Sequence, residues 1–278
     1  MTMLRNSAAA VILISCFTAT GWAQAPSATS PAASSPSKTA TKKAAPKAKA
    51  AAKQPAAETG PCRLGVISAL GDRFSVHKFG LTIFENEESE ALVNGWGLDD
   101  LPFARVRAAT GADPSVRRIA YAKGAFDPFY NPKSRFLRDA SEELPAIVRS
   151  ITSNANCERY LVITKYNATV SGTKMEIKGI GTYSQGIGSL VRHYHLFANV
   201  AISMYDGATY EKINRSFAGF GASLAAGLGL TEDPLTKLDE SHYPNPPESA
   251  SGSTALKERT RALVSARLDR MIPGYLQP

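Results

Sequence analysis

Two cysteines of this chain each stand just before a short apolar run. Cys62 precedes the run at 64–67, and Cys157 precedes the run at 160–163. Short apolar runs of this kind predict buried strands. If these strands are parallel neighbours, their first residues lie level, and a disulfide between them is geometrically reasonable. The bond would close a loop of about 95 residues and contribute up to about 4–5 kcal/mol in the chain-entropy model. We therefore predict a Cys62–Cys157 disulfide.

The first 23 residues indicate that the protein is exported. Residues 1–7 carry one positive charge, at Arg5, residues 8–17 are an apolar run, and residues 21–23 form a small-x-small site. This layout is typical of a bacterial secretory signal peptide. The apolar run is much shorter than the ~20 residues that cross a bilayer. We expect cleavage after Ala23 and release into the periplasm, where the two remaining cysteines can be oxidised.

The N-terminus has two alternative fates. Residues 13–16 resemble a permissive bacterial lipobox, in which Cys16 would be acylated and the protein would be an outer-membrane lipoprotein. The apolar stretch before Cys16 is short, and apolar Phe17 and Trp22 lie beyond it, which favours cleavage after Ala23. The other alternative is an uncleaved N-terminal anchor, which the small residues before the cleavage site disfavour.

Residues 24–60 have the composition of a disordered tether. They are rich in alanine, proline and lysine and contain no large apolar side chain, so burial cannot offset the entropy of ordering them. They carry six lysines against one glutamate, whereas residues 61–278 hold 25 basic and 23 acidic residues. The net charge of +8 is therefore concentrated in the tether, and nucleic acid is not an expected partner. The tether is either a spacer whose lysines contact anionic lipid or cell-wall polymer, or a passive solvated linker.

Residues 61–278 are enough for one large domain, and we predict a single α+β domain with a mixed or mostly antiparallel sheet. Gly71-Asp72 and Asp206-Gly207 predict two hairpins, because such pairs favour tight turns between strands. Helices are expected over about 100–109 and about 141–151. The expected strands cover 64–70, 73–84, 116–121, 159–166, 174–179, 193–205 and 208–217.

A C-terminal helix over about 253–271 is predicted to be amphipathic. Leu256, Leu263 and Leu268 fall on one face and arginines lie toward the other, which is typical of a helix packed on a sheet. The preceding segment, 234–252, is rich in proline and serine and is expected to be irregular.

The order of elements over about 140–278 resembles a known envelope module. A helix leads into the strand at 159–166, a hairpin around Tyr205-Asp206-Gly207 follows, and a helix closes the segment. In this order it is similar to the α/β domain of the curli-secretion lipoprotein family and to the amino-terminal domain of the Tol-system propeller protein. The resemblance covers roughly half of the chain, and it implies a non-enzymatic envelope scaffold. The insertion at 234–252 and the opening hairpin depart from the family pattern.

Two histidines are candidate metal ligands. His193 and His195 are two residues apart on a predicted strand and so point to the same face. A zinc site needs at least one further protein ligand, from His77, His242 or a carboxylate, and no spacing in the sequence places one nearby. The pair is either part of a metal site or two solvent-facing strand histidines.

An aromatic loop at 126–132 holds the candidate partner-binding residues. Phe126, Phe129 and Tyr130 stand among prolines, which restrict the backbone. Aromatic side chains in a rigid loop serve as interface anchors. The alternative is a loop that folds its aromatic side chains onto the core. The uncharged segment 218–230 is likewise either a buried connection or an exposed contact patch.

No sequence motif predicts catalysis or a bound cofactor. The glycine-rich stretch at 186–190 does not have the Gly-x-Ser-x-Gly spacing of a nucleophile elbow. The stretch at 219–224 lacks the third glycine of the Gly-x-Gly-x-x-Gly fingerprint that binds dinucleotides. We expect an exported periplasmic scaffold or binding protein without catalytic activity, which engages an envelope protein or a cell-wall or lipid surface. The alternative is a metal-dependent hydrolase that uses His193 and His195. A third hypothesis is a protein that binds a small ligand.

Overall fold

The computed structural model describes residues 60–80, 83–131, 140–170, 174–187, 191–214 and 236–277. These residues form the predicted single α+β domain, with helices packed on two mixed sheets. The signal segment with Cys16, the tether up to residue 59 and the segment 218–230 lie outside the described residues.

The first sheet has four strands in the order β10-β5-β1-β4. Its β1 (Cys62–Ser68) lies parallel to β4 (Val116–Arg118) on one side and to β5 (Cys157–Lys165) on the other. β10 (Val200–Asp206) runs antiparallel to β5 and forms one edge. Both β1 and β5 are buried along most of their length, as continuous apolar runs predict for strands that are covered on both faces.

The second sheet has five strands in the order β11-β9-β8-β2-β3. Its β2 (Arg73–Phe79) is antiparallel to β3 (Glu87–Leu92) and parallel to β8 (Ile180–Ile187). β9 (Val191–Ala198) is antiparallel to β8 on one side and to the two-residue β11 (Lys237–Leu238) on the other. The predicted mixed character is therefore confirmed, in two sheets.

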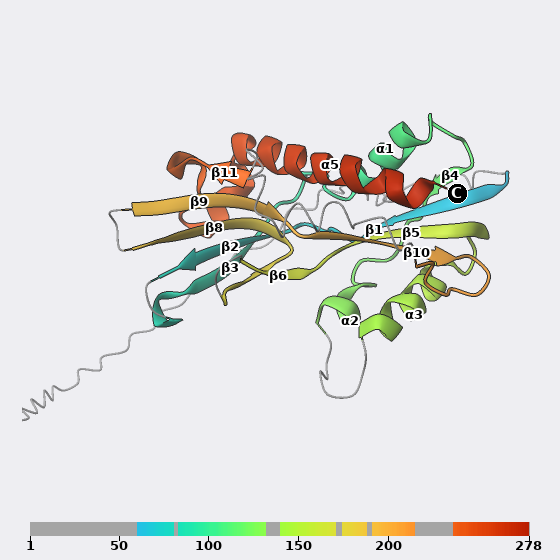
Figure 1. Cartoon of the computed structure of the whole chain (residues 1–278), viewed down its shortest axis with the longest axis horizontal. Helices are drawn as coiled ribbons and strands as arrows, with labels where there is room; N and C mark the ends of the chain where they lie inside the picture. Colours follow the sequence, from blue (N-terminus) through green and yellow to red (C-terminus); the bar gives the residue numbers. More distant parts are fainter. Residues whose placement is uncertain are drawn as a thin grey trace, which may run out of the picture. The chain divides into compact units, whose positions relative to one another are not determined.

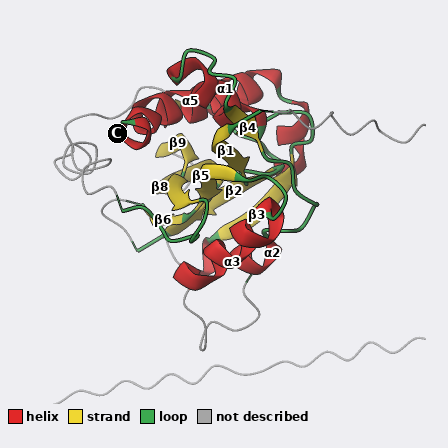
Figure 2. Ribbon diagram, turned by 90° about the vertical axis from the view of Figure 1, so that its right-hand side faces the viewer, coloured by secondary structure: helices red, strands yellow, loops and turns green. Residues whose placement is uncertain are grey.

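The two sheets share one main core. Only Asn199 separates β9 from β10, so a nearly continuous ribbon passes from the second sheet into the first (Figure 1). Apolar side chains from both sheets form a common hydrophobic cluster with α1 (Asp100–Ala109) and α5 (Thr254–Leu276). These two helices lie on the same side of the strands (Figure 2).

The C-terminal helix α5 confirms the predicted amphipathic helix and extends it by about one turn. Leu256, Leu263 and Leu268 are fully buried. The helix begins with Ser253 as its N-cap, whose hydroxyl oxygen accepts a hydrogen bond from the N–H of Leu256 (3.2 Å). Such a cap satisfies one of the free N–H groups of the first turn.

Two further helices cover the opposite face of the first sheet. α2 (Asp127–Tyr130) and α3 (Ala140–Thr152) lie on the side away from α1 and α5 (Figure 2). They pack on a second hydrophobic cluster, which includes Tyr160 and Val162 of β5. The alternate residues Leu161 and Ile163 face the main core, because successive side chains of a strand point to opposite faces.

The tight turn at Gly71-Asp72 does not close a hairpin, so this prediction is wrong. β1 and β2, which flank the turn, belong to different sheets. The side chain of Asp99 explains the difference. Its Oδ1 accepts hydrogen bonds from the N–H groups of Leu70 (2.8 Å) and Gly71 (3.1 Å) and from the hydroxyl of Ser68 (2.8 Å). These donors are therefore held by the start of α1 and are unavailable to a returning strand.

The turn at Asp206-Gly207 does reverse the chain. Asp206 Oδ1 accepts hydrogen bonds from the N–H groups of Ala208 (2.9 Å) and Thr209 (2.8 Å), and these bonds lower the pKa of Asp206. The predicted return strand is reduced, within the described residues, to a single bridge between Tyr205 and Lys212.

The predicted disulfide is present. Cys62 and Cys157 are direct partners in the parallel register of β1 and β5, with their Cα atoms 4.5 Å apart. A disulfide of this kind is typical of proteins outside the reducing cytosol. Among the described residues, no helix is long and apolar enough to cross a membrane.

A buried histidine lies beside the smallest hydrophobic cluster. His77 on β2 is 1% exposed, and its ring lies 5.8 Å from the rings of both Phe79 and Phe197. The hairpin of β6 (Asn167–Thr169) and β7 (Glu176–Lys178) contributes to the same cluster. Within the described part of the chain, Nε2 of His77 has no hydrogen-bond partner, so a proton on this ring would be poorly solvated.

Replacing His77 by leucine is expected to remove part of the acid sensitivity of the fold. Burial, the largest influence, lowers the pKa of His77; Glu88 and Glu90 act in the opposite direction and Lys178 in the same direction. Below the ordinary histidine pKa of about 6.5, the unfolded chain binds a proton that the folded protein does not. The free energy of unfolding therefore falls on acidification, by up to about 1.4 kcal/mol per pH unit from this group.

Urea denaturation at about pH 7.5 and about pH 5 tests this expectation, because the two values bracket the titration of a free histidine. The loss of stability between them should be smaller in His77→Leu than in the wild type. His193→Leu is the control, since it makes the same substitution at an exposed histidine. An identical loss in His77→Leu and the wild type would contradict the expectation.

Candidate binding site

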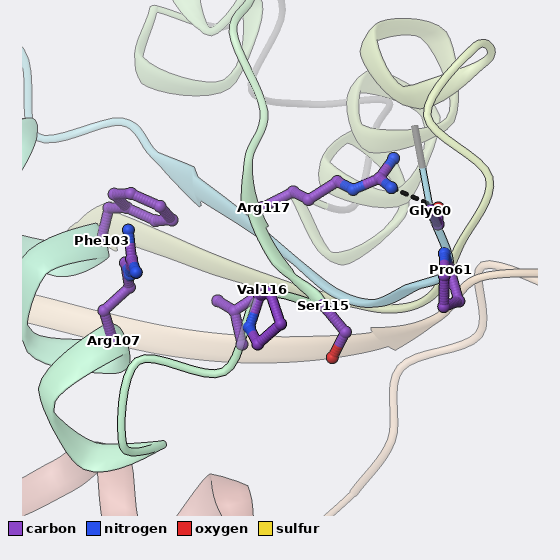
Figure 3. Close-up of a pocket in the computed structure, with 8 residues that line it drawn as sticks. Gly60, Pro61, Phe103, Arg107, Ser115, Val116 and Arg117 are labelled. Carbon is purple, nitrogen blue, oxygen red and sulfur yellow. Dashed lines mark hydrogen bonds between the residues drawn. The ribbon is translucent and has the colours of Figure 1, made fainter. Parts of the chain in front are cut away.

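A pocket of about 500 Å³ opens at the amino-terminal ends of β1 and β4, beside α1 (Figure 3). It is lined by residues before β1, on α1 and at the start of β4. These are Gly60, Pro61, Phe103, Arg107, Pro114, Ser115, Val116 and Arg117.

A turn of three residues sets the position of β4 at this pocket. Asp113 Oδ1 accepts hydrogen bonds from the hydroxyl (2.7 Å) and the N–H (2.8 Å) of Ser115, and these bonds lower the pKa of Asp113. The carbonyl oxygen of Ser115 accepts from the N–H groups of Arg63 (3.1 Å) and Leu64 (3.4 Å). An aspartate followed by proline and serine favours such a turn. It joins the start of β4 to the start of β1.

The α1 side of the pocket combines an apolar surface with one guanidinium group. Val116 is buried in the main core, and Phe103 packs against that core. The guanidinium carbon of Arg107 lies 5.9 Å from the centroid of the Phe103 ring, within the range of a cation–π contact. Its Nη2 also reaches the carbonyl oxygen of Ala112 (3.5 Å). Arg107 is thus held against the aromatic ring while it stays exposed.

A second guanidinium group lies on the other side of β4. Arg117 points away from Phe103 and Arg107 and toward Gly60 (Figure 3). Its Nη2 donates a hydrogen bond to the carbonyl oxygen of Gly60. Its Nε is buried and has no partner within the described residues. Because a guanidinium group carries five N–H donors, Arg117 retains donors for a further acceptor.

Two neighbouring arginines are neutralised by carboxylates. Arg118 pairs with Asp100 (2.6 Å), and Arg105 pairs with Asp269 (3.4 Å). Arg107 and Arg117 contact no carboxylate in the part of the chain that the structure describes. Arg107, beside the apolar surface of Phe103, favours a ligand that presents a carboxylate next to an apolar group, and Arg117 offers a second site for an acidic group on the other side of β4.

The aromatic side chains predicted to bind a partner lie against the core. Phe126 is 4% exposed, and its ring meets that of Tyr121 edge-on at 4.9 Å. Phe129 and Tyr130 are half-buried on the same cluster. The expectation of an exposed anchor is therefore wrong for Phe126, because the loop folds onto the second cluster.

Tyr130 joins the carboxyl ends of the two central strands. Its hydroxyl donates a hydrogen bond to the carbonyl oxygen of Ala69 (2.6 Å) and accepts one from the N–H of Lys165 (3.0 Å). The ammonium group of Lys165 lies 5.6 Å from the centroid of its ring. Burial raises the pKa of Tyr130 and lowers that of Lys165. The contacts of Tyr130 are therefore those of a structural residue.

The two candidate metal ligands lie in a separate groove of about 670 Å³ along β9 and β11. His193 is exposed there, and the ring of His195 is stacked on that of Tyr183 at 4.9 Å. No group of three or more histidine, cysteine, aspartate or glutamate side chains is placed to hold a metal ion, as far as the structure describes the chain. The described residues therefore bring no third ligand to the pair.

No protein-family model, curated protein or solved structure matches this chain. The candidate site is therefore defined by its geometry and charge alone. Sequence reasoning missed Arg107 and Arg117, which lie among other arginines in the sequence. The local signal was the turn sequence at 113–115, one residue before the two consecutive arginines of β4.

Proposed function

We propose that this protein is an exported, non-catalytic binding protein of the cell envelope, and that acidic groups of a protein partner bind at this pocket, to Arg107 beside α1 and to Arg117 on the other side of β4. The observation that carries the proposal is the pair of guanidinium groups, on Arg107 and Arg117, that lack a carboxylate partner within the described residues. Hydrogen bonds between arginine and carboxylate are about twice as strong as neutral ones. Phe103 and Val116 add an apolar surface for a neighbouring side chain.

Export is supported by three features of the chain. Residues 1–23 have the layout of a signal peptide, residues 24–60 have the composition of a tether, and Cys62 and Cys157 are joined. We assign the protein to the periplasm, with acylation at Cys16 as the lipoprotein alternative. The similarity of 140–278 to the curli-secretion and Tol envelope modules supports a scaffold role by analogy only.

Crosslinking of the full chain in a bacterial periplasm, followed by purification and quantitative mass spectrometry, tests the proposal. We expect the double variant Arg107→Glu/Arg117→Glu to recover the main protein partner at least about tenfold less than the wild type. The expectation follows because the variant replaces two groups that donate charge-assisted hydrogen bonds by two groups that repel a carboxylate. Each lost charge-assisted hydrogen bond is worth about 1.5–3 kcal/mol.

The matched control carries the same change in charge at exposed positions outside the pocket. Lys123→Glu/Lys174→Glu should recover the partner at the wild-type level. Equal recovery by both double variants would reject the pocket as the binding site. Recovery of cell-wall polymer or lipid alone, without a protein, would reject a protein partner.

A further inference from the structure

Among the described residues, the most exposed large apolar side chain lies between β2 and β3. Phe84 belongs to the short 3-10 turn η1 (Ile83–Glu85) and is 91% exposed, and Leu92 at the end of β3 follows at 56%. An aromatic ring left in water forgoes the stabilisation that burial would give it. Phe84 therefore adds nothing to the core and is available for contact with a partner.

The turn that carries this ring also presents an exposed carboxylate. The N–H of Gly80 donates a hydrogen bond to Asn86 Oδ1 (3.0 Å), and Lys78 Nζ donates one to Glu87 Oε1 (2.8 Å). The side chain of Glu87 is nevertheless 66% exposed, and an exposed ion pair of this kind contributes little to stability. Since a carboxylate can accept several hydrogen bonds, Glu87 can bind a further cation. We call residues 84–88 the tip.

The pocket beside α1 offers the complementary chemistry. Phe103 and Pro114 give it an apolar lining. Arg107 meets the ring of Phe103 and one backbone carbonyl group but no carboxylate within the described residues. The volume of about 500 Å³ lies in the range of about 300–1,000 Å³ that is typical of ligand pockets, which leaves room for a phenylalanine side chain. An exposed phenylalanine close to a glutamate is therefore the kind of ligand that this pocket favours.

The tip and the pocket lie at opposite ends of the ribbon that β9 and β10 form (Figure 1). β8 is antiparallel to β9 and β2 is parallel to β8, so β2 ends, and the tip follows, where β9 begins. β5 is antiparallel to β10 and β1 is parallel to β5, so β1 begins, beside the pocket, where β10 ends. A copy of the chain therefore cannot fill its own pocket with its own tip.

Resting on the proposed function, we propose that the protein partner of the pocket is a second copy of this chain, bound head to tail. The tip of one copy enters the pocket of the next, with Phe84 against Phe103 and Glu87 paired with Arg107. The contact joins two different surfaces, so a dimer keeps one free tip and one free pocket. Association of this kind continues into longer chains of molecules unless a ring closes.

Sedimentation velocity of the full chain, purified from the periplasm, tests the proposal. We expect the wild type to form species larger than a dimer as its concentration rises, and to dissociate in high salt, which screens the exposed ion pair. Phe84→Ser removes the ring and Arg107→Glu removes the charge-assisted hydrogen bond, so each should weaken self-association at least about tenfold. Leu92→Ser is the matched control at the other exposed apolar side chain and should associate like the wild type.

An equimolar mixture of the two variants separates head-to-tail contact from a symmetric dimer. Phe84→Ser keeps its pocket and Arg107→Glu keeps its tip, so the mixture can form one junction. We expect each variant alone to be a monomer and the mixture to form a 1:1 dimer that does not extend. Both side chains are exposed, so thermal denaturation should give wild-type midpoints for both variants.

Three results would overturn the head-to-tail contact. The first is a wild type that stays monomeric at every concentration, and the second is a mixture that stays monomeric. The third is loss of association in Phe84→Ser but not in Arg107→Glu, which would assign the contact to two tips.

The outcomes separate this inference from the proposed function. If Arg107→Glu/Arg117→Glu loses the envelope partner while the purified wild type stays monomeric, the pocket binds a different protein, and only the head-to-tail proposal fails. If the charge-reversed variant keeps its partner, the proposed function fails.

Discussion

Removing the Cys62–Cys157 disulfide is expected to lower the free energy of unfolding by about 2–5 kcal/mol. The bond joins the first residues of β1 and β5, whose Cα atoms are 4.5 Å apart, and it spans a sequence separation of 95 residues. Without it, the unfolded chain gains the conformational freedom of this long loop. The measurement is guanidinium denaturation of the double variant Cys62→Ala/Cys157→Ala beside the oxidised wild type.

A reducing agent provides the internal control for this prediction. It should shift the denaturation midpoint of the wild type toward that of the double variant, and it should leave the double variant itself unchanged. Since both strands lie in the middle of the first sheet, the loss should appear in the main unfolding transition. An unchanged midpoint in the reduced wild type would contradict the prediction.

Replacing Gly207 by alanine is expected to destabilise the fold by about 3 kcal/mol, at the upper end of the range for overpacking. A Cβ atom at this position would lie 1.8 Å from the carbonyl oxygen of Cys157 and 2.8 Å from that of Glu158. Both obstacles are backbone atoms of the central strand β5, so no side chain can rotate away. The N–H of Gly207 also donates to Glu158 (2.8 Å), and the necessary shift would stretch that bond.

Urea denaturation of Gly207→Ala measures this cost. Gly252→Ala is the matched control, because a Cβ atom at Gly252 would meet nothing within 4 Å. The control should be neutral or slightly more stable, since alanine restricts the unfolded chain. A loss below about 1 kcal/mol in Gly207→Ala would show that the turn relaxes at little cost.

Local signals in the sequence predicted much of the fold. The spacing of Leu256, Leu263 and Leu268 predicted α5 and the face that it buries. The positions of Cys62 and Cys157, each just before a predicted buried strand, led to the correct disulfide prediction, and the condition on which it rested, that the two strands are parallel neighbours, is met by β1 and β5. These features depend on spacing along a few residues, which the sequence displays directly.

The partners of the strands depend on contacts that the sequence does not display. Gly71 has a positive φ of 65°, as a tight turn requires, yet the turn leads into a second sheet. The reason is the side chain of Asp99, which lies 28 residues further along the chain and accepts the N–H of Gly71. A turn motif predicts a change of direction, but it does not determine which strand follows as a neighbour.

The candidate site was missed for a similar reason. Arg105, Arg107, Arg117 and Arg118 are alike in the sequence, and any of them could have been solvated surface residues. Only the fold places Asp269 beside Arg105 and Asp100 beside Arg118. The distinction between paired and available guanidinium groups therefore arises from tertiary contacts.

The position of the disulfide also has a mechanical consequence. Tension applied to the chain before Cys62 and resisted after Cys157 passes through the covalent bond between the two residues. The loop from 63 to 156 then carries no load, because the disulfide is the shorter path. That loop contains α1 and β4, so most of the pocket is shielded from a pull on the N-terminal segment. A partner could remain bound on the loop while the segment before it is stretched.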